Sequence, residues 1–334
     1  MSVSVVCPFF NEAGGIVPAV EKLLNSLKRD FNEWELILVD DGSTDNSVHE
    51  LLQFLDHNQS RLKIISLKTN HGRGRAIMTG IREAKGETIV TTEADGSWGS
   101  DIVLKMTELL DKSPEIDFVI ASPHLPGGGL IGVPWRRRIL SSFGNRLISS
   151  FFESSITMNT GMTRAYRRKV IYPLEVWENG KEFHLEVLLK LRSLGFECAE
   201  IPATITWGTE KKVKSLKSKR KSSTKILRTI SSHLRFTAIA RPTSYFAAFA
   251  FVFLFLSVLF LSLASYNLLI GEPSIFPAVV SLLNLILSLF FTCFSILFVK
   301  LGEVLREQWV APYKCQGYES PPSAEKGKII FPKP

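Results

Sequence analysis

The sequence predicts an α/β protein in which a mostly parallel, doubly wound sheet is followed by a hairpin of two membrane-spanning helices. Three observations lead to this prediction. Strand-like and helix-like segments alternate over residues 1–121. Two long windows without a charged residue follow, at 242–271 and 273–299. A strongly basic stretch lies directly before the first window.

The alternation is regular enough to place nine elements. Strands are expected where short apolar runs occur, at Ser4–Phe9, Glu35–Val39, Leu62–Leu67, Glu87–Thr92 and Asp117–Ala121. Helices are expected between them, at Ile16–Lys28, Asp45–Leu55 with Ser43 or Thr44 as its cap, Gly74–Ala84 and Asp101–Leu110. Such β–α repetition is typical of a parallel sheet, whose ligands bind at the carboxyl ends of its strands.

Polar residues follow three of the predicted strands. Asn11 and Glu12 follow the first strand, residues 40–45 follow the second, and residues 93–95 follow the fourth. Acidic side chains are costly to bury unless they are paired or bind metal. Their convergence on one sheet edge predicts a site for Mg²⁺ or Mn²⁺ with a phosphorylated ligand.

Two other interpretations of these loops were weighed. Ser43, Thr44 and Asp45 also fit a turn and helix cap, which we favour for these three residues, whereas we favour a functional role for Asp41 and Asp95. The first strand is not followed by a Walker lysine motif or a Gly-x-Gly-x-x-Gly, which argues against P-loop and dinucleotide sites.

A glycine-rich turn after the third strand supplies a further candidate. It reads Asn-His-Gly-Arg-Gly-Arg-Ala over residues 70–76, and its Arg73 is placed to reach a diphosphate. Taken alone, the turn is weak evidence because glycine turns often precede helices.

The apolar windows predict spans at about 244–268 and 277–299 within a membrane segment of 242–300. Each window exceeds the roughly 20 residues that cross a bilayer. The loop between them has no Lys or Arg, whereas basic residues precede the first span and follow the second. By the positive-inside rule, both ends face the cytoplasm. We therefore expect a cytosolic domain at 1–210 and a cytoplasmic tail at 301–334.

The basic residues are concentrated between the domain and the first span. Residues 211–241 hold eleven Lys or Arg and no Asp or Glu, and removing them from the net charge of +8 leaves −3. Because this segment adjoins a span, we interpret it as facing lipid headgroups rather than nucleic acid, with a solvated surface as the alternative. A second basic stretch at 135–152 fits either an interfacial helix or an ordinary surface helix. The four cysteines lack CxxC spacing, so neither a zinc site nor a disulfide framework is expected.

Together these motifs resemble family 2 glycosyltransferases with the GT-A fold. The matching pieces are Cys-Pro-Phe-Phe-Asn-Glu at 7–12, Val-Asp-Asp-Gly-Ser-Thr-Asp at 39–45 and Glu-Ala-Asp at 93–95. Asn-Thr-Gly-Met at 159–162, Arg-Ala-Tyr-Arg-Arg at 164–168, Phe-His-Leu-Glu-Val at 183–187 and Gly-Phe at 195–196 bring it nearer to dolichyl-phosphate mannose synthases and bacterial polyprenyl-phosphate glycosyltransferases. The resemblance covers residues 1 to about 215, and the two-span tail is similar to that of the bacterial subgroup.

The resemblance implies transfer of a sugar from a GDP- or UDP-linked donor to a polyprenyl or dolichyl phosphate at the cytoplasmic membrane face. It implies that Glu93 and Asp95 are catalytic and bind Mg²⁺ or Mn²⁺. The expected nucleotide-binding residues are Pro8, Asn11, Glu12, Asp40, Asp41, Arg73 and Ala94. The candidates for holding the acceptor phosphate are Arg137, Arg138, Lys211 and Lys212.

Four departures from the family pattern put the identity of the donor in doubt. Glu93 replaces the usual first Asp, and Ser97 stands where a Gln often helps the metal. Ser-Pro-His at 122–124 replaces the usual Ser-Arg-Tyr, and the usual Arg-x-x-Gly-x-Ser-Lys is blurred at 207–212.

The acceptor phosphate also bears on mechanism and on rival functions. A phosphate monoester is mostly ionised at neutral pH, so a strong general base is unnecessary.

A polysaccharide synthase would carry Gln-x-x-Arg-Trp before its channel helices, whereas the nearest match here, at 306–309, follows the last span in the wrong order. A catalytically inactive membrane module is the other alternative. The sequence is compatible with a homo-oligomer.

Overall fold

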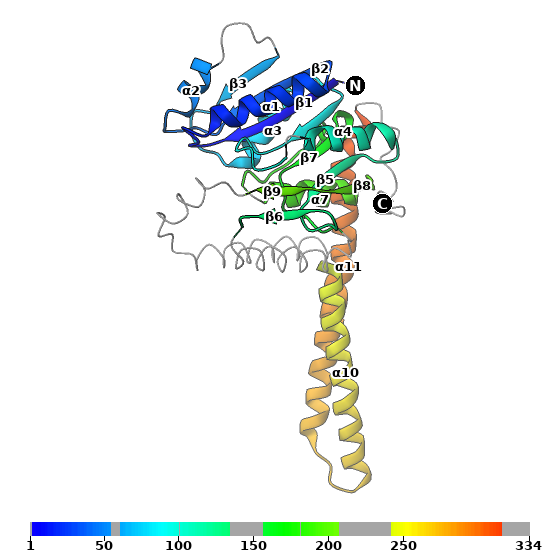
Figure 1. Cartoon of the computed structure of the whole chain (residues 1–334). Coiled ribbons are helices and arrows are strands. Elements are labelled where there is room, and N and C mark those ends of the chain that lie inside the picture. The colour runs from blue at the N-terminus through cyan, green and yellow to red at the C-terminus, as the bar shows by residue number, and fades with distance from the viewer. Residues whose placement is uncertain are drawn as a thin grey trace. The chain divides into compact units, whose positions relative to one another are not determined.

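A computed structural model describes residues 2–54, 61–99, 101–133, 156–180, 182–206 and 242–315 (Figure 1). The strands are β1 (Ser2–Phe9), β2 (Glu33–Asp40), β3 (Leu62–Ser66), β4 (Thr88–Thr91), β5 (Phe118–Ser122), β6 (Gly129–Ile131), β7 (Arg164–Arg167), β8 (Cys198–Pro202) and β9 (Thr204–Thr206). The helices are α1 (Ile16–Asp30), α2 (Ser47–Phe54), α3 (Arg73–Glu83), α4 (Ile102–Lys112), α6 (Arg168–Ile171), α7 (Phe183–Ser193), α10 (Pro242–Leu269) and α11 (Ile275–Lys314). All nine predicted elements of the first domain are confirmed in type.

Seven strands form one mixed sheet in the order β3-β2-β1-β4-β7-β5-β8. β1, β2, β3 and β4 pair in parallel with one another, as the alternation predicted. β7 is the exception, because it enters between β4 and β5 and is antiparallel to both. A second, two-stranded sheet pairs β6 with β9 in parallel, with Ile131 opposite Thr206.

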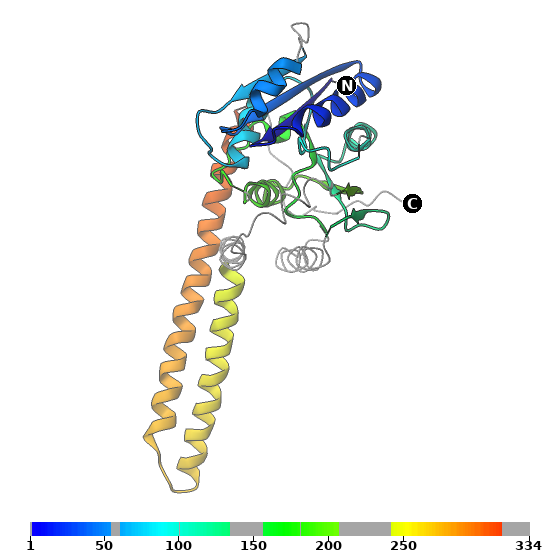
Figure 2. The same cartoon turned by 60° about the vertical axis from the view of Figure 1, so that its left-hand side comes forward.

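The sheet is covered on both faces, which explains why β2 reads as a continuous apolar run. Leu36 and Leu38 pack on the face that α1 and α4 cover, whereas Ile37 and Val39 pack on the face that α3 and α7 cover. Figure 2 shows helices on either side of the strands. Complete burial of each such side chain stabilises the fold by about 1.5–3 kcal/mol.

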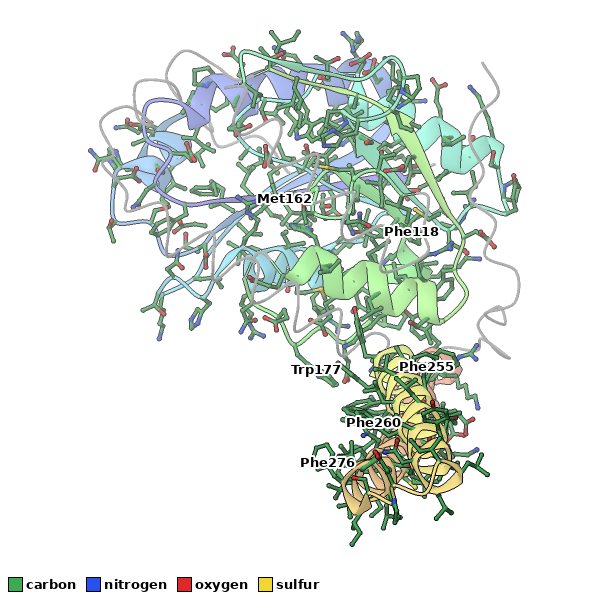
Figure 3. All side chains as sticks on the ribbon, turned by 90° about the horizontal axis from the view of Figure 1, so that it is seen from below. Phe118, Met162, Trp177, Phe255, Phe260 and Phe276 are labelled. Atoms are coloured by element: carbon green, nitrogen blue, oxygen red, sulfur yellow. The ribbon has the colours of Figure 1, made fainter. Side chains whose placement is uncertain are left out.

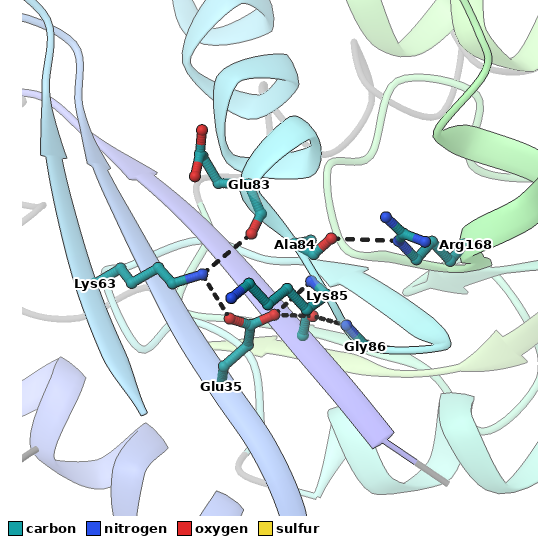
Figure 4. Close-up of polar contacts among 8 residues, drawn as sticks. Glu35, Lys63, Glu83, Ala84, Lys85, Gly86 and Arg168 are labelled. Atoms are coloured by element: carbon teal, nitrogen blue, oxygen red, sulfur yellow. Dashed lines mark hydrogen bonds and ion pairs between the residues drawn. The ribbon is translucent and has the colours of Figure 1, made fainter. Parts of the chain in front are cut away.

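The amino-terminal edge of the sheet is fixed by a polar cluster around Glu35 (Figure 4). Its carboxylate accepts hydrogen bonds from the Ser4 hydroxyl at 2.7 Å and the Lys85 N–H at 2.6 Å, and it pairs with Lys63 at 3.0 Å. Burial pushes the pKa of Glu35 upward, but these hydrogen bonds and the Lys63 charge outweigh burial and leave the pKa below its usual value. This edge is therefore occupied by structural contacts.

α10 and α11 form a helical hairpin that is apolar enough to cross a membrane. The candidate spans have mean hydropathies of 2.7 and 2.4, and only 11% and 6% of their most apolar windows are buried within the protein. Figure 3 shows Phe255 and Phe276 projecting outward from the pair. Low burial argues against soluble core helices, so the two helices indicate a membrane protein.

Serine side chains join the two helices of the hairpin. Ser257 donates to the Ser281 carbonyl at 3.0 Å, and Ser281 returns a hydrogen bond to the Ser257 carbonyl at 2.9 Å. Ser288 donates to the Ala250 carbonyl at 2.8 Å. Such bonds add to packing between helices where the hydrophobic effect offers little net drive in lipid.

The structure describes part of the segment that we expected to form a cytoplasmic tail, 301–334. α11 continues to Lys314, and Trp309, Val310 and Tyr313 pack against the core of the α/β domain. Tyr313 is fully buried beside Phe196, with ring centroids 5.3 Å apart. These apolar residues recur at helical spacing, so one face of this last part of α11 becomes part of the domain core.

Candidate functional site

The loop after β1 is held by the loop after β2. Asn11 has the one positive φ among the described non-glycine residues, 55°, a conformation that asparagine tolerates. Its N–H donates to Ser43 Oγ at 3.0 Å, and its Oδ1 accepts from the Thr44 N–H at 2.8 Å. The Glu12 N–H donates to Ser47 Oγ at 2.8 Å. Ser43 and Thr44, which we expected to cap α2, therefore fasten Asn11 instead.

The paired carboxylates after β2 fix two loops. Asp40 Oδ1 accepts from the Ser43 N–H at 2.8 Å. Asp41 accepts from the His71 N–H at 2.9 Å and from the Gly72 N–H at 3.0 Å. Both aspartates are buried, and the backbone N–H donors offset the free-energy cost of burying their carboxylates. Asp41 thus positions the glycine-rich turn that begins α3.

Arg73 is the first residue of α3 and faces the acidic loop after β4. Its Nη1 lies 3.9 Å from Glu93 Oε1, and both side chains are partly exposed. An exposed pair at this distance contributes at most about 1 kcal/mol, so Arg73 is only weakly committed to Glu93. A cation at a helix N-terminus creates a favourable position for an anion such as a diphosphate.

Glu93 and Asp95 are held in one turn by Ser97. The Ser97 N–H donates to Asp95 Oδ1 and its Oγ donates to Glu93 Oε2, each at 2.8 Å. The two carboxylates of the predicted Asp-x-Asp equivalent are therefore oriented by the same residue. Within the described ranges, no group of three or more His, Cys, Asp or Glu side chains is arranged to hold a metal.

A buried clamp holds the loop before β7 from both ends. At its start, Glu200 accepts from the Thr157 and Met158 N–H groups at 2.8 and 2.9 Å. At its end, the fully buried Arg164 donates to the carbonyls of Asn159 at 2.6 Å and Gly161 at 2.8 Å. Burial raises the pKa of Glu200, although the hydrogen bonds and the Arg164 charge oppose that rise. This loop adjoins β4, because β7 pairs with β4.

His184, in the first turn of α7, is a buried imidazole without a hydrogen bond. Its carbonyl accepts from Arg164 at 2.9 Å, but no described residue bonds either ring nitrogen. Burial first, and then the charges of Arg164 and Arg73, hold the pKa of His184 well below its ordinary value. The ring is therefore neutral at physiological pH.

The structure gathers most of the predicted site at the carboxyl edge of β1, β2 and β4: Asn11, Glu12, Asp40, Asp41, Arg73, Glu93 and Asp95. Pro8 and Ala94 are buried at this edge. The acceptor candidates Arg137, Arg138, Lys211 and Lys212 lie outside the described residues.

Sequence reasoning missed the clamp formed by Arg164 and Glu200. The notable signal was a charged residue inside each of two otherwise buried strands, in Arg-Ala-Tyr at 164–166 and in Cys-Ala-Glu-Ile at 198–201. A charge at such a position requires specific partners. The identity of those partners depended on the unforeseen insertion of β7.

The mostly parallel sheet and the acidic loops at its carboxyl edge define an α/β domain of the GT-A type. The chain belongs to glycosyl transferase family 2, whose model matches residues 4–174.

Two curated relatives carry the same description. Undecaprenyl-phosphate 4-deoxy-4-formamido-L-arabinose transferase of Proteus mirabilis is 33% identical over 177 residues, which cover 51% of this chain and 50% of that protein. The protein of that description from Photorhabdus laumondii is 32% identical over the same shares. The chain thus spans about half the length of the curated relatives it matches.

A solved structure supports the fold. Glucosyl-3-phosphoglycerate synthase from Mycobacterium tuberculosis, in complex with Mg²⁺ and uridine diphosphate, has a TM-score of 0.50 and 17% identity. The match covers 70% of this chain and 79% of that chain. At this identity the likeness concerns the fold alone.

Proposed function

We propose that this protein transfers a sugar from a nucleotide-sugar to a polyprenyl phosphate at the cytoplasmic face of a membrane. The observation that carries the proposal is the acidic pair Glu93 and Asp95 opposite Arg73, in a chain that also has two apolar helices. The family and the two undecaprenyl-phosphate sugar transferases that the chain resembles support this reaction.

The donor set of the acidic loop fits a divalent cation bound with a diphosphate. Mg²⁺ in nucleotide sites commonly takes one or two protein carboxylates, and phosphate oxygens and water complete its shell. Glu93 and Asp95 supply two carboxylates on one turn, so a third acidic ligand is not required. The bound metal, Mg²⁺ or Mn²⁺, would neutralise charge on the leaving diphosphate.

The remaining edge residues suit the donor nucleotide. Arg73 at the N-terminus of α3 is placed to attract the diphosphate. Asp40 and Asp41 shape the nucleoside wall, since their carboxylates fix residues 43 and 71–72. Asn11 and Glu12, whose N–H groups bond to the loop after β2, form the adjoining side. Pro8 and Ala94 are buried at the same edge of the sheet.

An acceptor phosphate accounts for the chemistry without a dedicated base. Its oxygen is already ionised at neutral pH and attacks the anomeric carbon directly, while the nucleoside diphosphate leaves. A sugar hydroxyl would instead have to lose a proton to a positioned base.

The topology supports a role for the basic residues in binding this phosphate. β6 and β9 are parallel and end side by side at Ile131 and Thr206. Arg137 follows Ile131 by six residues, and Lys211 follows Thr206 by five residues. The two basic stretches therefore follow strand ends that are paired with each other. Arg138 and Lys212 come next in the two stretches.

Sugar transfer by the full-length protein in detergent tests the function. We expect labelled sugar to pass to a polyprenyl phosphate but not to the corresponding polyprenol. Asp95→Ala should abolish transfer, whereas Asp111→Ala, an exposed aspartate on α4, should leave it unchanged. Equal transfer to both lipids, or full activity of Asp95→Ala, would contradict the proposal. Label found only in polymer would indicate a polysaccharide synthase, and the absence of any transfer with any nucleotide-sugar would indicate an inactive module.

A double variant tests the acceptor residues. Replacing Arg137 and Arg138 by Gln should raise the lipid concentration needed for half-maximal transfer and leave donor binding intact. Loss of donor binding would instead assign these arginines to the nucleotide.

A further inference from the structure

Ser97 uses all of its polar groups to organise the loop that carries Glu93 and Asp95. Its N–H donates to Asp95 Oδ1 and its hydroxyl donates to Glu93 Oε2, both at 2.8 Å. Its carbonyl accepts from the Thr206 N–H, also at 2.8 Å. The residue is only 6% exposed, so water competes little for these bonds.

The same loop is anchored to the second sheet and to the core. Trp98 forms an antiparallel bridge with Ile205. Both residues pack in the apolar cluster on the face of the main sheet that α1 and α4 cover. Thr206 ends β9, which β6 supports by parallel pairing. Ser97 therefore sits on a rigid base from which it orients two flexible acidic side chains.

Glu93 shows why such orientation matters. Its Oε1 faces Arg73 at 3.9 Å, while its Oε2 is held by the Ser97 hydroxyl. Without that hydroxyl, Arg73 is the one contact of the Glu93 carboxylate that remains among the described residues. A glutamate side chain with several free torsions loses rotamer entropy when it is fixed. Because the Ser97 hydroxyl already holds the Glu93 carboxylate, less of this entropy is lost when a ligand binds.

We propose that Ser97 is a positioning residue that holds Glu93 and Asp95 in the arrangement that receives the divalent cation of the nucleotide. The inference rests on the proposed function and adds to it a residue that sets metal affinity through the carboxylates.

The test measures Mn²⁺ binding to the purified full-length protein by electron paramagnetic resonance of the free ion, with UDP and in parallel with GDP. Ser97→Ala should raise the Mn²⁺ concentration for half-saturation about tenfold, which corresponds to about 1.4 kcal/mol. Ser97→Thr, which keeps the hydroxyl, should restore most of the affinity. In transfer assays, excess Mn²⁺ should return Ser97→Ala to nearly the wild-type kcat, which a general loss of structure would not allow.

Ser66→Ala, an exposed serine at the end of β3, is the matched control and should not change Mn²⁺ binding. Unchanged or tighter Mn²⁺ binding by Ser97→Ala would overturn the role of Ser97 and leave the proposed function standing. If the wild-type protein binds no Mn²⁺ with either nucleotide, both the metal dependence of the proposed function and the role of Ser97 are wrong.

Discussion

Tyr313, in the last turn of α11, donates a hydrogen bond from its hydroxyl to the carbonyl oxygen of Val170 at 2.7 Å. The two residues are 143 positions apart, and both are fully buried. Trp309 and Val310 pack against the same cluster. Trp309, Val310 and Tyr313 are therefore a structural part of the α/β domain.

Tyr313→Phe should destabilise the domain by about 1–2 kcal/mol, because the buried Val170 carbonyl loses its donor. Tyr313→Ala should cost about 3–5 kcal/mol, since it also opens a cavity beside Phe196. Thermal unfolding of the detergent-solubilised protein measures both changes. Tyr266→Phe, at an exposed site on α10, should leave the transition unchanged. Equal melting temperatures for Tyr313→Ala and wild type would show that α11 does not stabilise the domain.

Local pattern was sufficient to predict the first half of the fold. Strands such as Glu35–Val39 are short, apolar and followed by polar loops, and each crossover helix has a clear apolar stripe. β7 was not foreseen because its antiparallel entry between β4 and β5 depends on long-range pairing. Its sequence, Arg-Ala-Tyr-Arg, does not resemble a central strand until the partners of Arg164 are known.

The sequence predicted which residues form the candidate site, but it did not predict the contacts among them. The parallel topology alone brings Asp41 and Glu93 to one edge, so their proximity follows from the predicted fold. The role of Ser97 follows from three hydrogen bonds whose partners lie two, four and 109 positions away. The first two hydrogen bonds are local. The contact with Thr206 requires the second sheet, which the periodicity of the sequence did not predict.

Gly42 tests how closely the loop after β2 must approach the turn before α3. A Cβ at this position would lie 2.5 Å from the Thr69 carbonyl carbon, and the backbone φ is +73°. Gly42→Ala should therefore cost at least about 2 kcal/mol and weaken nucleotide binding by displacing the turn that Asp41 holds. Thermal unfolding and titration with UDP and GDP report the two effects.

Gly14→Ala separates backbone strain from steric overlap. Gly14 has a φ of +78°, but a Cβ there would meet nothing within 4 Å. This variant should show the strain of a positive φ without displacing the loop after β2 or the turn before α3. Nucleotide binding weakened equally in both variants would contradict the assigned role of the Gly42 contact.

The proposed cytoplasmic placement of the α/β domain predicts the accessibility of two engineered cysteines. Ser274→Cys lies in the loop between α10 and α11, and Lys105→Cys lies on the surface of α4. Both are made with Cys293 and Cys315 changed to Ser, since these two native cysteines are exposed whereas Cys7 and Cys198 are buried. An impermeant maleimide applied to intact cells should label Ser274→Cys, and it should label Lys105→Cys only after permeabilisation. The reverse pattern would place the domain outside.

His184 predicts an acid sensitivity whose sign can be worked out. Its pKa in the folded protein is lowered well below 6.5, chiefly by burial and then by Arg164 and Arg73. The unfolded chain therefore takes up a proton as the pH falls below about 6.5, whereas the folded protein does not. Protonation stabilises the unfolded state, so this residue's contribution to stability is full above pH 6.5 and declines toward the lower folded pKa.

Replacing the ring isolates this effect. His184→Leu removes a proton acceptor and two buried nitrogens without a described partner, so it should raise stability at pH 7.5 by about 1 kcal/mol. The gain should be larger at pH 5.5, because the wild type then bears the additional proton-linked loss. Melting temperatures of both proteins at the two pH values give the comparison, in which every other titrating group is shared. His49→Leu, which changes an exposed histidine on α2, should show no comparable gain at either pH. If the difference between His184→Leu and wild type is the same at both pH values, the imidazole is not held neutral by its surroundings.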